Sequence, residues 1–430
     1  MNRYSIRRIG GKTEYPIWSM ALVLMLILIS PFVSPYLNYV ALLICIYRVI
    51  RYDAKVFATD YCLLIPLSQL FRSQDGMSLL IWLCLLAAVW YFVNGGIRRN
   101  GAVIALLVLL NYLILRMQMN INDFVLCFGQ VFVLYVLLMK QDQDSAERAI
   151  KAFCWSVFAT SVYALVFRGT PQLIAICGRE VPAFFGSNLK RFQGLFVDPN
   201  NYMSLVILAL ALLCKIRDAG RIGKVSFWML IVTLAIFGAM SYSKTYLIVL
   251  VLLGGIYIIW QFWNKKAFRG MVLATMITIV GAVLLLWEGS PLAVIMDRFS
   301  TAENLDDLTT GRTELFATYM NVITKSATNF LFGVGLNGQM LSKDPHNLYL
   351  EIWYLFGAVG LVLFTVFFIT LMVSVSRRTK GKQNLIAKYV VLWMVLAVYM
   401  SLHGITGLIS YASFLLAYFA MMITKKEEAR

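Results

Sequence analysis

The fold of this chain is decided by the stretch from Gly311 to Gly360, which reads GRTELFATYMNVITKSATNFLFGVGLNGQMLSKDPHNLYLEIWYLFGAVG. Its first part is polar, and its last part enters a long apolar helix that continues past Gly360. The polar part belongs to a longer polar segment, 288–347, in a chain that otherwise reads as apolar spans. Because unpaired polar groups beside a membrane are costly, this segment predicts half of a functional site at the outer face of a membrane.

The composition predicts an all-α polytopic membrane protein. Hydrophobic residues make up 60% of the 430 residues and charged residues only 14%, whereas a soluble domain carries about 25% charged residues. Apolar runs long enough to cross a bilayer recur along the chain, and we expect about 12–14 transmembrane helices. The whole chain, 1–430, is expected to form a single integral membrane domain.

The distribution of charge predicts the topology. Most of the 38 Lys and Arg residues fall in alternate loops, as the positive-inside rule requires. Both termini are therefore expected in the cytoplasm, and the loops 169–200 and 288–347 on the outside. This pattern also accounts for the net charge of +17, so no nucleic-acid partner is expected. The first apolar run is too long for a cleavable signal peptide.

Motifs for metals and cofactors are not found. The seven cysteines form no CxxC pair, and Cys177 is the only one expected outside a span. There is no Walker loop or dinucleotide fingerprint. Asp306 and Asp307 are adjacent acids, but no third ligand is suitably spaced. We therefore expect neither a metal nor a cofactor.

The first external loop of functional interest, 169–200, ends in RFQGLFVDPN, and a helix follows. Asp198 and Asn200 are candidates to cap that helix, and at least one of them is expected to do so. Capping does not explain Arg179, Lys190 and Arg191, which lie on the outer side against the positive-inside rule.

Two further cations fall on the same side. Lys244 lies in SYSKT, between two spans, and Arg312 opens the stretch quoted above. Lys244 alone could simply extend its amine to the membrane interface. Four or five cations converging on one outer face suggest instead a polyanionic ligand such as a phosphate.

The large external loop, 288–347, carries a second kind of chemistry. The spacing of Leu315, Phe316, Tyr319, Val322 and Ile323 predicts an amphipathic helix lying along the outer surface. A glycine turn then precedes His346 and Asn347, at the start of the long apolar helix. A histidine there could be a neighbour of a helix cap. It is also the side chain best suited to take a proton near neutral pH.

These motifs, taken in order, resemble the O-antigen ligase/polymerase superfamily of bacterial envelope enzymes. The motifs that carry the resemblance are Arg191-x-x-Gly194-x-x-x-Asp198-Pro199-Asn200, Ser-Tyr-Ser-Lys244-Thr, Gly311-Arg312, Phe332-Gly-Val-Gly335 and Pro345-His346-Asn347-x-Tyr349. The resemblance covers about 190–375. It departs at Lys244, where members often have Arg, and Lys cannot form a bidentate grip on phosphate.

The resemblance implies a GT-C-like membrane glycosyltransferase with a large extracytoplasmic loop that contains short helices. Such an enzyme would act on undecaprenyl-pyrophosphate-linked glycan donors and acceptors at the outer face of the bacterial cytoplasmic membrane, by metal-independent, inverting transfer. Arg191 and Arg312 would hold the pyrophosphate and His346 would act on the acceptor hydroxyl. Arg179, Lys190, Lys244, Asp198, Asn200 and Asn347 are further candidates to bind substrate.

The compact loop between Arg312 and His346, and the Asp-Pro-Asn and Ser-Lys-Thr forms, favour a polymerase of capsular, exopolysaccharide or O-antigen repeat units. Its partners would include membrane lipids, a chain-length regulator and a flippase. One alternative is an O-antigen ligase that transfers glycan to lipid A core or another acceptor. A second is a transporter of lipid-linked sugar, but transporters place polar segments near the midplane and often show inverted repeats.

Overall fold

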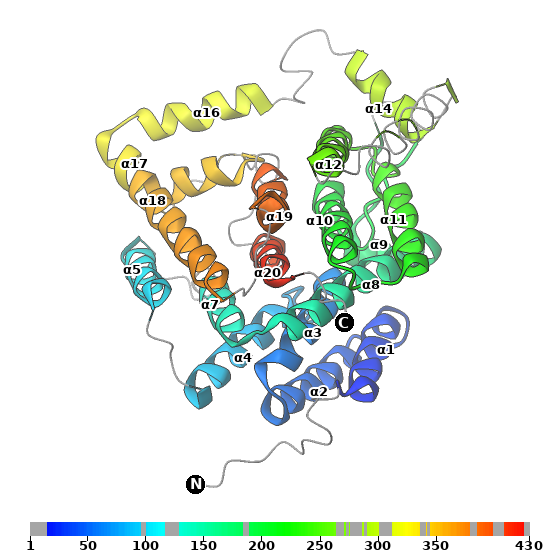
Figure 1. Cartoon of the computed structure of the whole chain (residues 1–430), viewed down its shortest axis with the longest axis horizontal. Coiled ribbons are helices and arrows are strands. Elements are labelled where there is room, and N and C mark those ends of the chain that lie inside the picture. Colours follow the sequence, from blue (N-terminus) through cyan, green and yellow to red (C-terminus); the bar gives the residue numbers. More distant parts are fainter. Residues whose placement is uncertain are drawn as a thin grey trace.

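The computed structural model describes residues 15–95, 100–116, 129–183, 189–263, 271, 275, 286–287, 290–300, 312–335, 341, 345–378, 385–398 and 408–424. Over these residues regular structure is helical, with two isolated bridges and no strand (Figure 1). The all-α prediction is confirmed. Asp306, Asp307 and the loop tip around Gly338 lie outside the described residues.

The helices follow one another with short connections. Their bounds are α1 (Ile17–Val33), α2 (Leu37–Arg51), α3 (Ala54–Leu64), η1 (Ile65–Leu67), α4 (Leu79–Gly95), α5 (Gly101–Arg116), α7 (Gln130–Lys140), α8 (Gln143–Phe167), α9 (Pro171–Cys177), α10 (Pro199–Asp218), α11 (Lys224–Ala239), α12 (Lys244–Trp263), α14 (Pro291–Ser300), α16 (Arg312–Thr324), α17 (Ala327–Phe332), α18 (Leu348–Ser376), α19 (Leu385–Val398) and α20 (Leu408–Met422).

The apolar helices have the character of membrane spans. Among the described residues, α8, α10 and α18 are long and apolar enough to cross a bilayer by themselves. Seven further apolar helices are shorter. Large apolar side chains point away from the protein, such as Trp18, Leu115 and Val225, which is the arrangement expected when lipid is the solvent. The chain is therefore a polytopic membrane protein, while the number of spans stays a prediction.

Helices α8, α10 and α20 form the centre of the bundle. Helix α20 is buried along nearly its whole length and packs against α7, α8, α10, α18 and α19. Phe414 of α20 stacks on Phe368 of α18, with ring centroids 4.0 Å apart. Figure 1 shows α19 and α20 between α18 on one side and α10 and α12 on the other.

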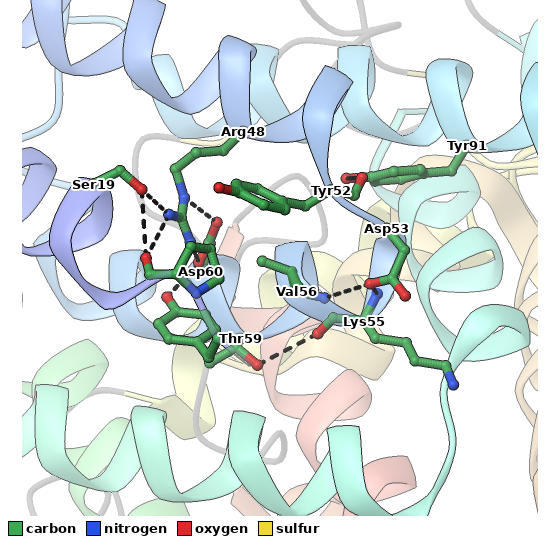
Figure 2. Close-up of polar contacts among 11 residues, drawn as sticks. Ser19, Arg48, Tyr52, Asp53, Lys55, Val56, Thr59, Asp60 and Tyr91 are labelled. Carbon is green, nitrogen blue, oxygen red and sulfur yellow. Dashed lines mark hydrogen bonds and ion pairs between the residues drawn. The ribbon is translucent and has the colours of Figure 1, made fainter. Parts of the chain in front are cut away.

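A buried ion pair ties the first three helices together (Figure 2). Arg48 of α2 donates to Asp60 of α3 through Nε (2.8 Å) and Nη2 (2.7 Å), and both side chains are almost fully buried. Its Nη1 donates to the Pro16 carbonyl (2.8 Å) and to the Ser19 hydroxyl, and Tyr15 donates to Asp60. Arg48 belongs to a loop that was expected to be exposed and basic, but these contacts make it an interior residue.

Helix α18 is broken, although the sequence predicts one continuous apolar helix from Leu348. Gly357 has φ 69° and ψ −177°, which no helix accommodates. The break divides α18 into a short first half, 348–356, and a long second half, 358–376. In Figure 1 the two halves run in different directions, and the first half reaches from α17 toward α19.

Candidate functional site

Loop 169–200 folds back on itself and thereby places Arg191. The chain on either side of 184–188 pairs through the Ala183 amide to the Leu189 carbonyl (2.7 Å) and the Arg191 amide to the Val181 carbonyl (2.8 Å). The next amide, of Phe192, donates to the Met240 carbonyl (2.9 Å). Two loops that are about fifty residues apart in sequence therefore lie side by side, as the order of the motifs alone could not show.

The turn that follows Arg191 depends on glycine. Gly194 has φ 53°, which disfavours any residue with a side chain. A Cβ atom at this position would lie 2.4 Å from the ring of Tyr202, so the ring fills the space that the glycine leaves. This explains why the glycine stands three residues after Arg191 in the motif.

The Arg191 guanidinium is anchored between two segments. Its Nε donates to the Ser241 carbonyl (2.8 Å) and its Nη2 to the Asn200 Oδ1 (3.4 Å). The Ser243 hydroxyl donates to the same Asn200 oxygen (3.5 Å). Arg191, Asn200 and the SYSKT segment thus meet where α10 and α12 begin. We call Arg191, Asn200, Ser241 and Ser243 the arginine cluster.

Asp198 and Arg312 adjoin this cluster. Asp198 caps α10, because its Oδ1 accepts from the Asn200 amide (2.8 Å), so the expectation that one of the two residues caps this helix is confirmed. Burial lowers the pKa of the Arg312 guanidinium, and the Asp198 carboxylate opposes that shift. No described residue accepts a hydrogen bond from the Arg312 guanidinium, which is therefore well suited to meet an anion.

The other three predicted cations differ in their placement. Lys244 is half-buried and is the first residue of α12, directly after Ser243. Arg179 and Lys190 are exposed, and over the described residues their side chains make no hydrogen bond or ion pair. The structure brings Lys244 to the cluster and leaves Arg179 and Lys190 outside it.

His346 lies in a separate, tightly defined turn. Its φ of 47° is in the left-handed region, which is uncommon for a residue with a side chain and is often found at functional sites. The next residue, Asn347, caps α18 by accepting from the amides of Tyr349 (3.0 Å) and Leu350 (3.1 Å). Asn347 therefore has a structural role that its selection as a substrate-binding candidate did not include.

Helix α19 connects the histidine to the arginine cluster. The Tyr349 hydroxyl donates to the Leu396 carbonyl (2.8 Å), which seats the start of α18 on the end of α19. Helix α19 also packs against α10 and α12, the helices that begin at the cluster. In Figure 1 the first half of α18 reaches α19 from one side, and α10 and α12 lie on its other side.

The expected amphipathic helix is present as α16, from Arg312 to Thr324. Tyr319 and Ile323 are its buried residues, and the Tyr319 ring meets the Tyr354 ring edge-on at 4.8 Å. Phe316, which was expected on the same apolar face, is 49% exposed. The buried face is therefore narrower than the sequence spacing indicated.

Two arginines that were not singled out from the sequence support these loops. Arg168 is buried, and its Nη2 donates to the carbonyls of Cys177 (2.9 Å) and Phe196 (3.2 Å), which joins the two ends of loop 169–200. Arg116 donates through Nη2 to the Gly333 carbonyl (2.7 Å). Both follow long apolar runs on the predicted outer side. The departure from the positive-inside rule that pointed to Arg191 could have found them.

Comparison with known proteins gives one match. Residues 227–365 match the family model described as O-antigen ligase. The match includes Lys244, Arg312 and His346, and it leaves Arg191 and the first half of the chain outside. Neither a curated protein nor a solved structure matches the chain.

Proposed function

We propose, from the membership of this chain in the O-antigen ligase/polymerase superfamily, that it polymerises oligosaccharide repeat units carried on undecaprenyl pyrophosphate. The reaction would take place at the outer face of the bacterial cytoplasmic membrane, with both termini in the cytoplasm. The observation that carries the proposal is the anchoring of Arg191 on Asn200 and Ser241, with Arg312 and Lys244 adjoining and His346 reaching α19 from the other side.

The arginines would bind the leaving group. Breaking the bond between the sugar and the pyrophosphate transfers an electron pair to a phosphate oxygen, and guanidinium groups stabilise the charge that develops there. Arg191 is held by its contacts to Ser241 and Asn200 before any ligand arrives. Positive charge from Arg191, Arg312 and Lys244 would supply this stabilisation without requiring a metal.

His346 would act on the acceptor. A hydroxyl of the acceptor sugar attacks the anomeric carbon from the side opposite the pyrophosphate, so the configuration inverts. One C–O bond forms, one C–O bond to the pyrophosphate breaks, and the hydroxyl proton passes to the His346 imidazole. The products are an extended glycan and a free lipid pyrophosphate. Arg179 and Lys190, which are exposed, would contact the glycan or lipid at the entrance.

A ligase is the second candidate, because the matched family model is described as O-antigen ligase. It would use the same donor and the same arginines but pass the glycan to lipid A core or another acceptor. The compact loop between Arg312 and His346 favours the polymerase. The two functions differ in the acceptor, which makes them separable in one assay. A chain-length regulator and a flippase would be partners of the polymerase.

The test uses the purified protein in liposomes with lipid-linked repeat units, EDTA and no nucleotide. We expect polymer from the wild type and little from His346→Ala, which should still bind the donor lipid. Lys325→Ala is the matched control, because Lys325 is exposed on the same loop. Transfer only after lipid A core is added would establish the ligase. Movement of the donor across the bilayer without any transfer would refute the enzyme and indicate a transporter.

A further inference from the structure

Helix α18 leaves three consecutive carbonyl groups outside its hydrogen-bond ladder, just before the break at Gly357. In an unbroken helix they would accept from the amides four residues later. Buried carbonyls need other partners, and here these come from outside the helix. The Val334 amide donates to Tyr354 O (2.9 Å), the Gly335 amide to Leu355 O (2.9 Å) and the Tyr112 hydroxyl to Phe356 O (2.5 Å).

The turn that supplies two of these donors is itself fixed by backbone contact. Gly333 and Gly357 both have positive φ, 73° and 69°. A Cβ atom at Gly333 would lie 2.5 Å from the Leu355 backbone, and one at Gly357 would lie 2.2 Å from the Leu331 carbonyl oxygen. The two backbones touch, so neither glycine tolerates a side chain without displacing the other segment.

Helix α5 closes the arrangement from a third direction. Tyr112 and Arg116 are four residues apart and so lie on one face of α5. Tyr112 holds the carbonyl of Phe356 and Arg116 holds the carbonyl of Gly333, at 2.5 and 2.7 Å. One helix thus grips both the broken end of α18 and the turn that is paired with it. We call Tyr112 and Arg116 the α5 brace.

The brace sets the direction of the first half of α18. That half, 348–356, is fixed at the break by α5 and at its start by the Tyr349 bond to the Leu396 carbonyl of α19. His346 stands two residues before this half and is joined to it through the cap residue Asn347. A continuous helix would carry His346 along the axis of the second half. The break turns it aside toward α19, which packs on α10 and α12.

We propose that Tyr112 and Arg116 are positioning residues, which hold the first half of α18 so that His346 faces the arginine cluster across α19. The inference rests on the proposed function, because it assigns the brace its purpose through His346. Arg116 has a competing role to be tested. Its Nε is buried and has no hydrogen-bond partner among the described residues, so it could instead bind the donor phosphate directly.

Three variants separate these roles. Tyr112→Phe removes only the hydroxyl, Arg116→Met keeps the length of the side chain but no donor, and Arg116→Lys keeps one donor. Asn111→Ala is the matched control on the same helix, since the Asn111 amide bonds only to the Leu107 carbonyl of α5 (2.7 Å). Misplacing a catalytic group by about 1 Å can cost on the order of 10²-fold in rate.

The first readout is the rate of chain growth in liposomes as a function of donor concentration. We expect Tyr112→Phe and Arg116→Met to lower the maximal rate by about tenfold or more, with the half-saturating donor concentration unchanged. Arg116→Lys should recover much of the rate, and Asn111→Ala should match the wild type. A raised half-saturating concentration in Arg116→Met would make Arg116 a donor ligand and overturn the proposal.

The second readout does not depend on activity. Hydrogen–deuterium exchange should become faster in the amides of 348–356 in both donor-removing variants, while the amides of α10 stay as in the wild type. If the wild type makes no polymer, the proposed function fails and exchange still tests the brace. Unchanged exchange at 348–356 would overturn the brace. Faster exchange with full activity would reduce it to a structural contact and also overturn the positioning role.

Discussion

Arg191 shows how a binding side chain is prepared before its ligand arrives. The Ser241 carbonyl and the Asn200 amide oxygen hold one side of its guanidinium, at 2.8 and 3.4 Å. Guanidinium is planar and rigid, so fixing two nitrogens orients the whole group. Lysine has one nitrogen on a flexible stem and cannot reproduce both contacts together.

Arg191→Lys should therefore lose most of the polymerising activity although it keeps the charge. We expect the rate to fall by on the order of 10²–10³, the effect of removing one charge-stabilising donor. Arg312→Lys should lose less, since no described residue fixes the Arg312 guanidinium in this way. The measurement is polymer formed in liposomes at equal protein abundance. Near wild-type polymer from Arg191→Lys would contradict the anchored-fork interpretation.

Asp198 and Asn200 make a second prediction at this scale, because the structure separates roles that the sequence left open. Asp198 caps α10, whereas the Asn200 side chain accepts from Arg191 and Ser243. Asp198→Ala should lower stability by about 1 kcal/mol, the usual cost of losing a cap. Asn200→Ala should weaken donor binding with little effect on stability. Thermal unfolding and donor titration of both variants check this; equal behaviour of the two would contradict it.

The sequence predicted which residues matter at the site better than how they are held. Positive charge on the outer side pointed to Arg191 and Arg312 because it departs from a strong rule of membrane topology. The same signal gave Arg179 and Lys190, which are exposed. Sequence cannot separate these cases, because the Arg191 anchor is a main-chain carbonyl of Ser241, fifty residues away. Any residue type at 241 would offer that carbonyl.

At the scale of elements, the apolar helices were predictable and the break in α18 was not. The residues around Gly357 are apolar on both sides, so hydropathy runs through the break without a change. Glycine alone does not break a helix. The break depends on the turn at Gly333–Gly335 and on Tyr112, which supply the missing hydrogen bonds from elsewhere in the chain.

Gly357→Ala should accordingly destabilise the protein. The substitution places a Cβ atom against the Leu331 carbonyl and a side chain at φ 69°, and such strained positions cost on the order of 1–3 kcal/mol. Gly255→Ala in α12 is the control, because a Cβ atom there meets nothing within 4 Å. Thermal unfolding in detergent should show a lower midpoint for Gly357→Ala only. Equal midpoints would mean that the break closes without cost.

The Arg48–Asp60 pair joins α1, α2 and α3 and gives a prediction of its own (Figure 2). Removing one partner of a buried pair leaves the other charge uncompensated, so Arg48→Met should cost about 3–5 kcal/mol. The double variant Arg48→Met/Asp60→Leu should recover much of this loss, because no lone charge remains buried. Unfolding midpoints of the single and double variants give the comparison. A double variant no more stable than Arg48→Met would exclude this mechanism.

At the scale of the whole molecule, the placement of the site on one side of the membrane rests on charge alone. Lys325 is exposed after α16, on the loop expected outside, and Arg377 is exposed at the end of α18, expected inside. Single cysteines at these positions can report the side that each occupies. Burial raises the pKa of the Cys177 thiol, although Arg168 and Arg72 oppose this, so at neutral pH it stays protonated and unreactive.

Lys325→Cys should therefore react with an impermeant maleimide in intact cells, and Arg377→Cys only after permeabilisation. Both variants are made with Cys127 replaced by Ser, and that parent protein is the blank. The described native cysteines are buried or half-buried, so they should give little background. The second half of α18, which separates the two positions, must cross the bilayer for this result. Labelling of Arg377→Cys in intact cells, with Lys325→Cys protected, would invert the topology and place the arginine cluster in the cytoplasm, where the proposed donor is not extended.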